Sequence, residues 1–110
     1  MTRKTPPIAA NILRQAAEVL RAVAHPLRLR ILELLEDGQP RCVTEIQEYL
    51  KTRQSATSAQ LALLRDRGIL SARRDGVQVY YSVANQAVRQ VIDCIRRHQS
   101  SFEARAGLRI

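Results

Sequence analysis

Arginine, glutamine and serine side chains lie on one predicted helix and directly before it, in a pattern that suits contact with a nucleic-acid duplex. Arg53 precedes the helix expected over residues 54–67, and Arg65 lies in its last turn. Arginines in these places would hold phosphates, which gives salt-dependent affinity but no sequence information. Glutamine can pair with adenine, serine with several bases, and an alanine methyl can contact a thymine methyl. The candidate base-reading residues, near the N-terminus of this helix, are Gln54, Ser55, Ser58 and Ala59.

A basic β-hairpin is predicted directly after that helix. Residues 69–74 and 77–83 have the composition of strands and flank Asp75-Gly76, a dipeptide typical of tight hairpin turns because glycine accepts a positive φ. The residues predicted to contact the DNA backbone or the adjacent minor groove from this hairpin are Arg73, Arg74 and Gln78. Residues 44–84 thus predict a helix, a turn, a second helix and a hairpin, in that order. This order places one helix in a major groove with a β-wing beside it.

The rest of the chain predicts a small, mainly helical domain. Helical spacing of apolar residues and breaks at His25-Pro26, at the turn 37–40 and at Gly68 indicate helices over 9–24, 26–36, 43–50, 54–67 and 85–104. Thr44 is a candidate cap for the third helix, and His25 is interpreted as a helix-boundary residue. We expect a flexible arm at residues 1–8, one domain at 9–104 and a tail at 105–110.

Length and charge restrict the classes of function. The chain has 110 residues, the size of one domain, and 18 lysines and arginines against 10 aspartates and glutamates give a formal net charge of +8. Such an excess favours a polyanionic partner, although charge alone does not separate nucleic acid from membrane lipid. The sequence lacks an apolar run of about 18 residues and a secretory signal, so we expect a cytoplasmic protein without a membrane partner.

These motifs together resemble the ArsR/SmtB family of bacterial transcriptional repressors. The resemblance is carried by residues 20–32, by the Leu-x-x-Leu-Arg-x-x-Gly-Ile pattern of residues 61–69 and by the hairpin at residues 73–83. It implies a winged helix-turn-helix fold, mainly α with a β-hairpin wing between the fourth and last helices. It also implies a homodimer built from the first and last helices that binds double-stranded operator DNA, represses transcription and is released by an inducer. The apolar stripes on the two terminal helices agree with a dimer, or alternatively complete the core of the monomer.

The signal that would release the protein is not evident, because the family's sensor sites do not match. The family's Cys-Val-Cys metal motif is replaced by Cys42-Val43-Thr44, and the residue two after Asp93 in the last helix is Ile95. The second helix has Glu33 where persulfide-sensing members have a cysteine. Cys94 and His98 share a helix face and are the candidate metal ligands, while Cys42 and Cys94 are the candidate redox-sensing thiols. A structural role for these residues is the simpler alternative, and a metal ion at Cys94 and His98 is the one candidate cofactor.

Three other classes of function compete with a transcriptional repressor. An enzyme is not expected, because the sequence lacks a glycine-rich phosphate loop and a paired acidic cluster. A DNA-architectural protein would favour minor-groove wedges over a defined recognition helix and wing. A winged-helix module that binds proteins remains the third alternative, and operator preference with strong salt dependence would distinguish a repressor from both binding alternatives.

Overall fold

The computed structural model describes residues 5–107, so parts of the predicted arm (residues 1–4) and tail (residues 108–110) lie outside it. Six helices follow one another in the described chain: α1 (Ala10–Val23), α2 (Pro26–Leu35), α3 (Val43–Leu50), α4 (Gln54–Asp66), α5 (Gln86–Arg97) and α6 (Gln99–Gly107). Three strands form one antiparallel sheet in the order β1-β3-β2: β1 (Arg41–Cys42), β2 (Leu70–Asp75) and β3 (Gln78–Val83). The first four predicted helices are confirmed to within one residue at each end.

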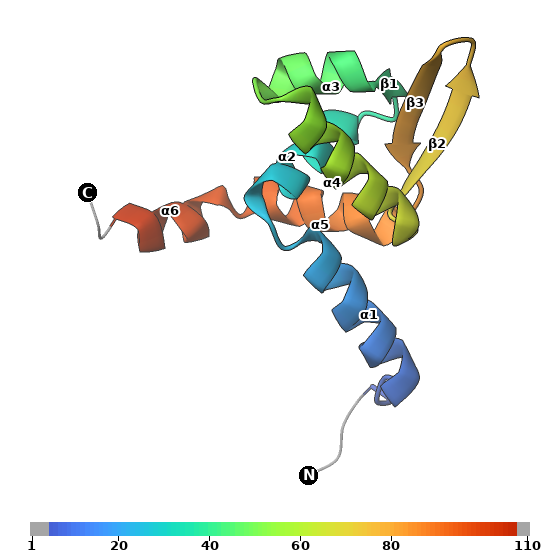
Figure 1. The fold of residues 1–110 in the computed structure, drawn as a ribbon. Coiled ribbons are helices and arrows are strands. Elements are labelled where there is room, and N and C mark those ends of the chain that lie inside the picture. Colours follow the sequence, from blue (N-terminus) through green and yellow to red (C-terminus); the bar gives the residue numbers. More distant parts are fainter. Residues whose placement is uncertain (1–4, 108–110) are drawn as a thin grey trace.

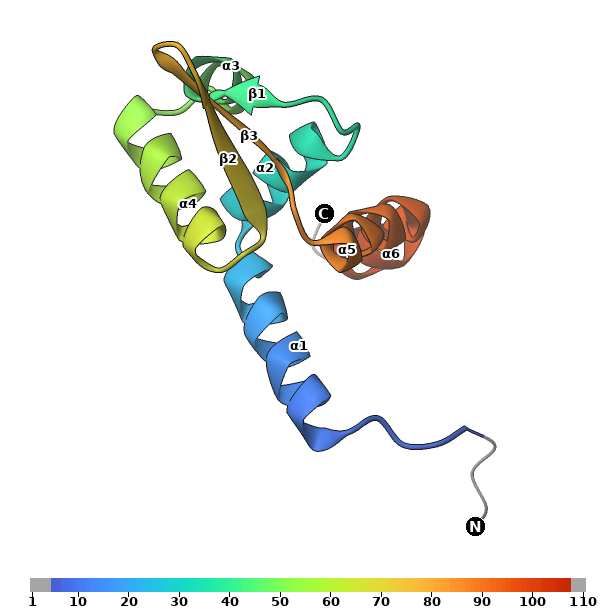
Figure 2. The same cartoon turned by 90° about the vertical axis from the view of Figure 1, so that its right-hand side faces the viewer.

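Helices α2, α3 and α4 form the body of the molecule, and the β2–β3 hairpin extends from its side (Figure 1). Helix α1 projects downward from this body, and α6 projects sideways beyond α5. Seen from the side, α4 and α5 lie on opposite sides of α2 (Figure 2). The outer surface of α4 and the tip of the hairpin therefore lie away from α5 and α6, whereas β3 also contacts α5.

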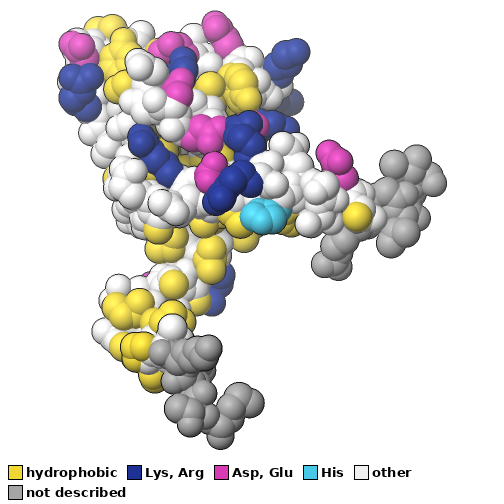
Figure 3. All heavy atoms as spheres, turned by 180° about the vertical axis from the view of Figure 1, so that it is seen from behind, with side chains coloured by type: hydrophobic (Ala, Val, Ile, Leu, Met, Phe, Trp, Pro, Cys, Tyr) yellow, Lys and Arg dark blue, Asp and Glu magenta, His cyan; other side chains and the backbone are white. Residues whose placement is uncertain are grey.

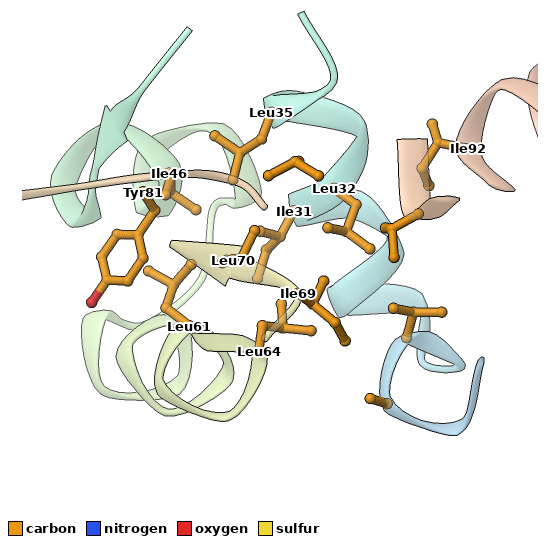
Figure 4. Packing of buried hydrophobic residues seen from close by; sticks show 14 residues of the cluster. Ile31, Leu32, Leu35, Ile46, Leu61, Leu64, Ile69, Leu70, Tyr81 and Ile92 are labelled. Carbon is orange, nitrogen blue, oxygen red and sulfur yellow. The ribbon is translucent and has the colours of Figure 1, made fainter. Parts of the chain in front are cut away.

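A single apolar cluster joins helices α1 to α5 with β2 and β3 (Figure 4). Aliphatic side chains fill it, and Tyr81 on β3 is its aromatic member. The largest fully buried apolar side chains come from α2, α3, α4, α5 and the residue before β2: Ile31, Leu32, Leu35, Ile46, Leu61, Leu64, Ile69 and Val88. Because α4 contributes fully buried leucines to this cluster, its rotation about its own axis is set by hydrophobic packing.

The boundary between α1 and α2 follows from the His25-Pro26 pair. His25 has an extended backbone, and its Nδ1 atom accepts a hydrogen bond from the Leu27 N–H at 3.1 Å. Pro26 occupies the first position of α2, where a missing N–H is tolerated. The interpretation of His25 as a helix-boundary residue is confirmed.

The predicted final helix is wrong as a single element, because α5 ends at Arg97 and α6 begins at Gln99. Side chains at the break bond to backbone carbonyls of the preceding turn: His98 Nδ1 lies 2.8 Å from the Cys94 carbonyl oxygen, and Gln99 Nε2 donates to the Arg96 carbonyl at 3.1 Å. Such bonds compete with continuation of the helix.

Three smaller features of the fold differ from what the sequence predicts. The N-cap of α3 is Cys42 rather than Thr44. The Cys42 N–H donates to Glu45 Oε1 at 3.0 Å in a capping box. The acceptor role lowers the pKa of Glu45, mainly through this backbone bond. Strand β1 was not predicted, because its two residues are too few to give an alternating pattern. The hairpin turn is displaced by one residue, since Asp75 pairs with Gln78 and the central residues are Gly76-Val77.

Candidate nucleic-acid interface

A tight connection sets the angle between α3 and α4. Helix α3 is followed by its C-cap residue Lys51, which has a left-handed backbone with φ 54° and donates its N–H to the Gln47 carbonyl at 2.8 Å. This conformation is uncommon for a residue with a side chain and is held here by the surrounding fold. After Thr52 and Arg53, the chain enters α4 in a new direction, which gives the helix-turn-helix arrangement.

The inner face of α4 is fixed by three fully buried residues. Thr57, Leu61 and Leu64 are each 0% exposed. The hydroxyl of Thr57 donates to the Arg53 carbonyl at 3.1 Å, so its one buried polar atom is satisfied. The face that carries these three residues is therefore the packed face of α4.

The outer face carries the predicted base-reading set. The side chains of this set are all exposed at the N-terminal half of α4: Gln54, Ser55, Ser58 and Ala59. They are small or uncharged, and neither another helix nor the sheet covers them. This surface has the size and polarity that a major groove can accept.

Arginines lie at both ends of this surface. Arg53 is exposed immediately before α4. Arg65 is exposed in the last turn, where its guanidinium forms an ion pair with the neighbouring Asp66 at 3.2 Å. Both members of this pair are largely in solvent, so the pair is weak and Arg65 can exchange Asp66 for another anion.

The wing adds a second group of basic side chains. Arg73 and Arg74 are exposed on β2, and their β3 partners are Tyr80 and Val79. Gly76 has φ +65°, as the two-residue turn requires. The wing tip also carries Val77, which is 91% exposed, a feature that the sequence analysis did not single out. Gln78 is exposed at the start of β3.

The two candidate redox-sensing thiols do not pair with each other. Cys42 is buried at the start of α3, whereas Cys94 is exposed on α5, and both are free thiols. Cys94 Sγ lies 3.7 Å from His98 Nδ1, so the predicted proximity of these two side chains is confirmed. Within residues 5–107, no three histidine, cysteine, aspartate or glutamate side chains converge on one point.

An apolar groove of about 330 Å³ lies between α1 and α5. Its lining is almost entirely apolar: Ile12, Ala16, Val19, Leu20, Val23, Ala87, Val88 and Val91, with Gln15 and Asn85. Three large side chains of α1 are about half exposed: Ile12, Leu13 and Leu20. Apolar side chains form a continuous stripe along the projecting α1 (Figure 3). Most of the α1 stripe therefore does not complete the core of the monomer.

A second pocket, of about 280 Å³, lies between α2 and α5 and was not foreseen. Its polar rim holds Arg30, Glu33, Arg96 and Gln99 over apolar side chains such as Leu29 and Ile92. The Arg96 guanidinium pairs with Glu36, the residue that caps the C-terminus of α2, and so links α5 to α2 beside this pocket. These residues are distant in sequence, so no local pattern could have grouped them.

Comparison with known proteins assigns the chain to a family. Residues 25–72 match the family described as bacterial regulatory protein, arsR family. The HTH-type transcriptional regulator YgaV of Escherichia coli is 37% identical over 82 residues, which cover 74% of this chain and 83% of that protein. The chain belongs to the ArsR family of bacterial regulatory proteins.

Solved structures agree with this ArsR-family assignment. The transcriptional repressor PagR of Bacillus anthracis is 34% identical, with a TM-score of 0.73, over 79% of this chain and 99% of PagR. The homodimeric winged helix-turn-helix DNA-binding domain Mb0332 of Mycobacterium bovis is 29% identical, with a TM-score of 0.73, over 94% of this chain and 95% of that domain. The predicted winged helix-turn-helix fold is thus confirmed. Over the described residues, the helices are too short or too polar to cross a bilayer.

Proposed function

We propose that this ArsR-family chain is a homodimeric transcriptional repressor that places α4 in the major groove of its operator. The observation that supports this most directly is the division of α4 into a fully buried inner face and an exposed outer face of Gln54, Ser55, Ser58 and Ala59. A helix held so firmly on one side presents the other side in a fixed orientation, as recognition of base edges requires. The family's regulators and the similarity to PagR support the same role.

The basic side chains would act on the sugar-phosphate backbone. Arg53 and Arg65 flank the outer face of α4, and Arg73, Arg74 and Gln78 extend the contact along the wing. Phosphate contacts of this kind orient the protein on the duplex and give affinity that falls steeply with salt. Asp66 is the residue that Arg65 would release on binding.

The dimer would form through α1 and α5. The groove between these helices and the exposed Ile12, Leu13 and Leu20 offer an apolar surface that the monomer leaves uncovered. A symmetric dimer would present two α4 helices to a pseudo-palindromic site. The homodimeric state of Mb0332 supports this assembly. Residues 9–104 would form the DNA-binding and dimerisation domain of a cytoplasmic, non-catalytic protein.

An inducer would release the protein from the operator. Of the two thiols, Cys94 is favoured for contact with a thiol oxidant, because it is exposed and Cys42 is buried. A metal ion at Cys94 and His98 or a small organic ligand are the other classes of inducer. Operator affinity of the reduced, oxidised and metal-loaded protein would separate the classes.

A binding experiment tests the proposed function. Duplexes are selected from a random library with the full chain, and their affinity is measured by fluorescence anisotropy as the salt concentration rises. We expect a shared pseudo-palindromic sequence and a steep loss of affinity with salt. Binding without any selected sequence would instead favour an architectural protein, and failure to bind any duplex at low salt would favour a protein-interaction module.

A further inference from the structure

Arg28 on α2 joins the end of the proposed dimerisation helix to the side of the proposed recognition helix. Its Nε donates to Gln60 Oε1 on α4 at 2.7 Å, and its Nη1 donates to the carbonyl oxygen of Ala22 on α1 at 3.0 Å. The side chain is half-buried, and no acidic residue in the described part of the chain forms an ion pair with it. A single guanidinium therefore bonds to neutral acceptors on both sides of α2.

The contact with Ala22 follows from the proline that starts α2. A helical carbonyl normally accepts from the N–H four residues later, and for Ala22 that residue is Pro26, which has none. Ala22 is 3% exposed, so water cannot easily replace the missing donor. An unsatisfied buried carbonyl is costly, and the Arg28 guanidinium supplies the donor. This bond holds one edge of the guanidinium at the end of α1.

The contact with Gln60 acts on the rotation of α4. Gln60 is half-buried and lies between the packed Leu61 and the outward-facing Ala59 in sequence. A guanidinium is planar and its donors have fixed directions. Because Nη1 of Arg28 is held by the Ala22 carbonyl on α1, the positions at which Nε can donate to Gln60 are restricted. A turn or tilt of α4 would break this bond before it removed the leucines from the core.

We propose that Arg28 is a positioning residue that sets the orientation of α4 relative to α1, and through it the spacing between the two recognition helices of the dimer. The inference rests on the proposed function, because it requires α1 to lie at the dimer interface and α4 in the groove. Hydrophobic packing holds α4 in place, and the Arg28 bonds select one orientation from those that the packing allows. Arg28 itself lies on α2, away from the outer face of α4, and contacts no base.

A double-mutant cycle tests the proposal with the full chain. The variants are Arg28→Lys, which keeps the charge but loses the planar fork, Gln60→Met, which removes the acceptor at similar volume, and the double variant. The probe is the duplex selected by the wild-type protein, and a scrambled duplex of the same length measures non-specific binding. Gln39→Met is the matched control, because Gln39 is exposed in the turn between α2 and β1.

We expect each single variant to lose on the order of ten-fold in operator affinity, about the effect of one charge-assisted hydrogen bond. The double variant should lose no more than either single variant, since both changes break the same bond. Non-specific affinity should stay at the wild-type value in all variants, and Gln39→Met should behave as wild type. Losses that multiply in the double variant would show that Gln60 contacts DNA independently of Arg28 and would overturn the proposal.

A second measurement keeps the proposal open to refutation if Arg28→Lys does not fold. The selected duplex is altered by inserting one base pair between its two half-sites. Wild type should lose more affinity for the altered duplex than Gln60→Met does, because its recognition helices are held more firmly. Equal losses would refute the role of Arg28, whereas the absence of any selected duplex with wild type would refute the proposed function instead.

Discussion

The Tyr49 hydroxyl on α3 donates a hydrogen bond to Glu33 Oε1 on α2 at 3.1 Å. The same carboxylate oxygen accepts from Arg30 Nη1 at 2.5 Å, so Glu33 links the first helix of the helix-turn-helix unit to α2. The bond from Arg30 is the main reason that the pKa of Glu33 lies below its ordinary value, with Tyr49 and the nearby charge of Arg96 acting in the same direction. These interactions outweigh the opposing effect of partial burial.

We expect Glu33→Gln to lower the stability of the fold at neutral pH by about 0.5–1 kcal/mol, the range of a partly exposed ion pair. A carboxyl whose pKa is depressed by folding stabilises the protein above the unfolded pKa, and this contribution is lost as the pH falls through the folded pKa. Urea unfolding at pH 7 and at several values below 4.5, the ordinary pKa, should therefore show a difference that shrinks with acidity.

The exposed Glu48 on α3 provides the control for this experiment. Glu48→Gln removes a carboxylate from the same region, and we expect little change in stability at any pH. If Glu33→Gln were as stable as wild type at pH 7, or if the difference persisted unchanged at low pH, the link between α2 and α3 would not depend on the ionised carboxylate.

Gln54→Ala should relax base preference without abolishing DNA binding. The Gln54 amide is exposed at the first residue of α4, where it can make two hydrogen bonds to an adenine. Loss of such a pair reduces discrimination at one base position by about 1–3 kcal/mol. The measurement is a comparison of affinities for the selected duplex and for duplexes changed at each position. Unchanged discrimination at every position would remove Gln54 from the base-reading set.

Arg73→Ala should weaken binding to all duplexes to a similar degree. Arg73 is exposed on β2, where the proposed contact is with phosphate and carries no sequence information. Loss of one phosphate contact should reduce the slope of log affinity against log salt by about 1. Arg14→Ala on α1 is a suitable control, because it removes the same charge far from the wing. A salt slope equal to that of wild type would contradict the phosphate contact.

Ile12→Glu should convert the dimer to a monomer. Ile12 is 49% exposed and lines the groove between α1 and α5, so in the proposed dimer a glutamate there would be buried without a partner. Sedimentation velocity should show a slower species, and operator affinity should fall with it. Asn11→Glu places the same charge on an exposed neighbouring residue and should leave the dimer intact. A dimer that survived Ile12→Glu would place the interface elsewhere.

The sequence was sufficient for the elements that local chemistry determines. Pro26 and Gly68 mark helix boundaries through a missing N–H and a positive φ of 73°, and the face of α4 follows from the spacing of its apolar residues. It was insufficient where a helix breaks within an otherwise continuous helical pattern. The end of α5 depends on side-chain bonds of His98 and Gln99 that compete with the helix.

The sequence pattern also could not predict which side chains form bonds between helices. The Arg28 bond to Gln60 joins residues 32 positions apart, and an arginine on an amphipathic helix has the same local pattern whether it faces solvent or another helix. Strand β1 pairs with β3 through Arg41 and Cys42, a contact created by the fold rather than by alternation of apolar residues.

Cys94 should react with a maleimide in the native protein well before Cys42. Cys94 is exposed on α5, whereas Cys42 is 8% exposed at the start of α3, with its N–H bonded to Glu45. Labelling of Cys42 requires local opening of that turn, so its rate should be at least about ten-fold lower. Mass spectrometry of peptides after a short exposure gives the two rates, and both thiols should react equally in denaturant.

The Cys94→Ser variant separates accessibility from function. Its native form should take up almost no label in the short exposure, and its operator affinity under reducing conditions should equal that of wild type, because Cys94 lies on α5, on the other side of α2 from α4. If an oxidant releases wild type from the operator but not Cys94→Ser, the exposed thiol is the sensor. Release of both proteins by the same oxidant would exclude Cys94 as the necessary sensor, and faster labelling of Cys42 would contradict its buried position.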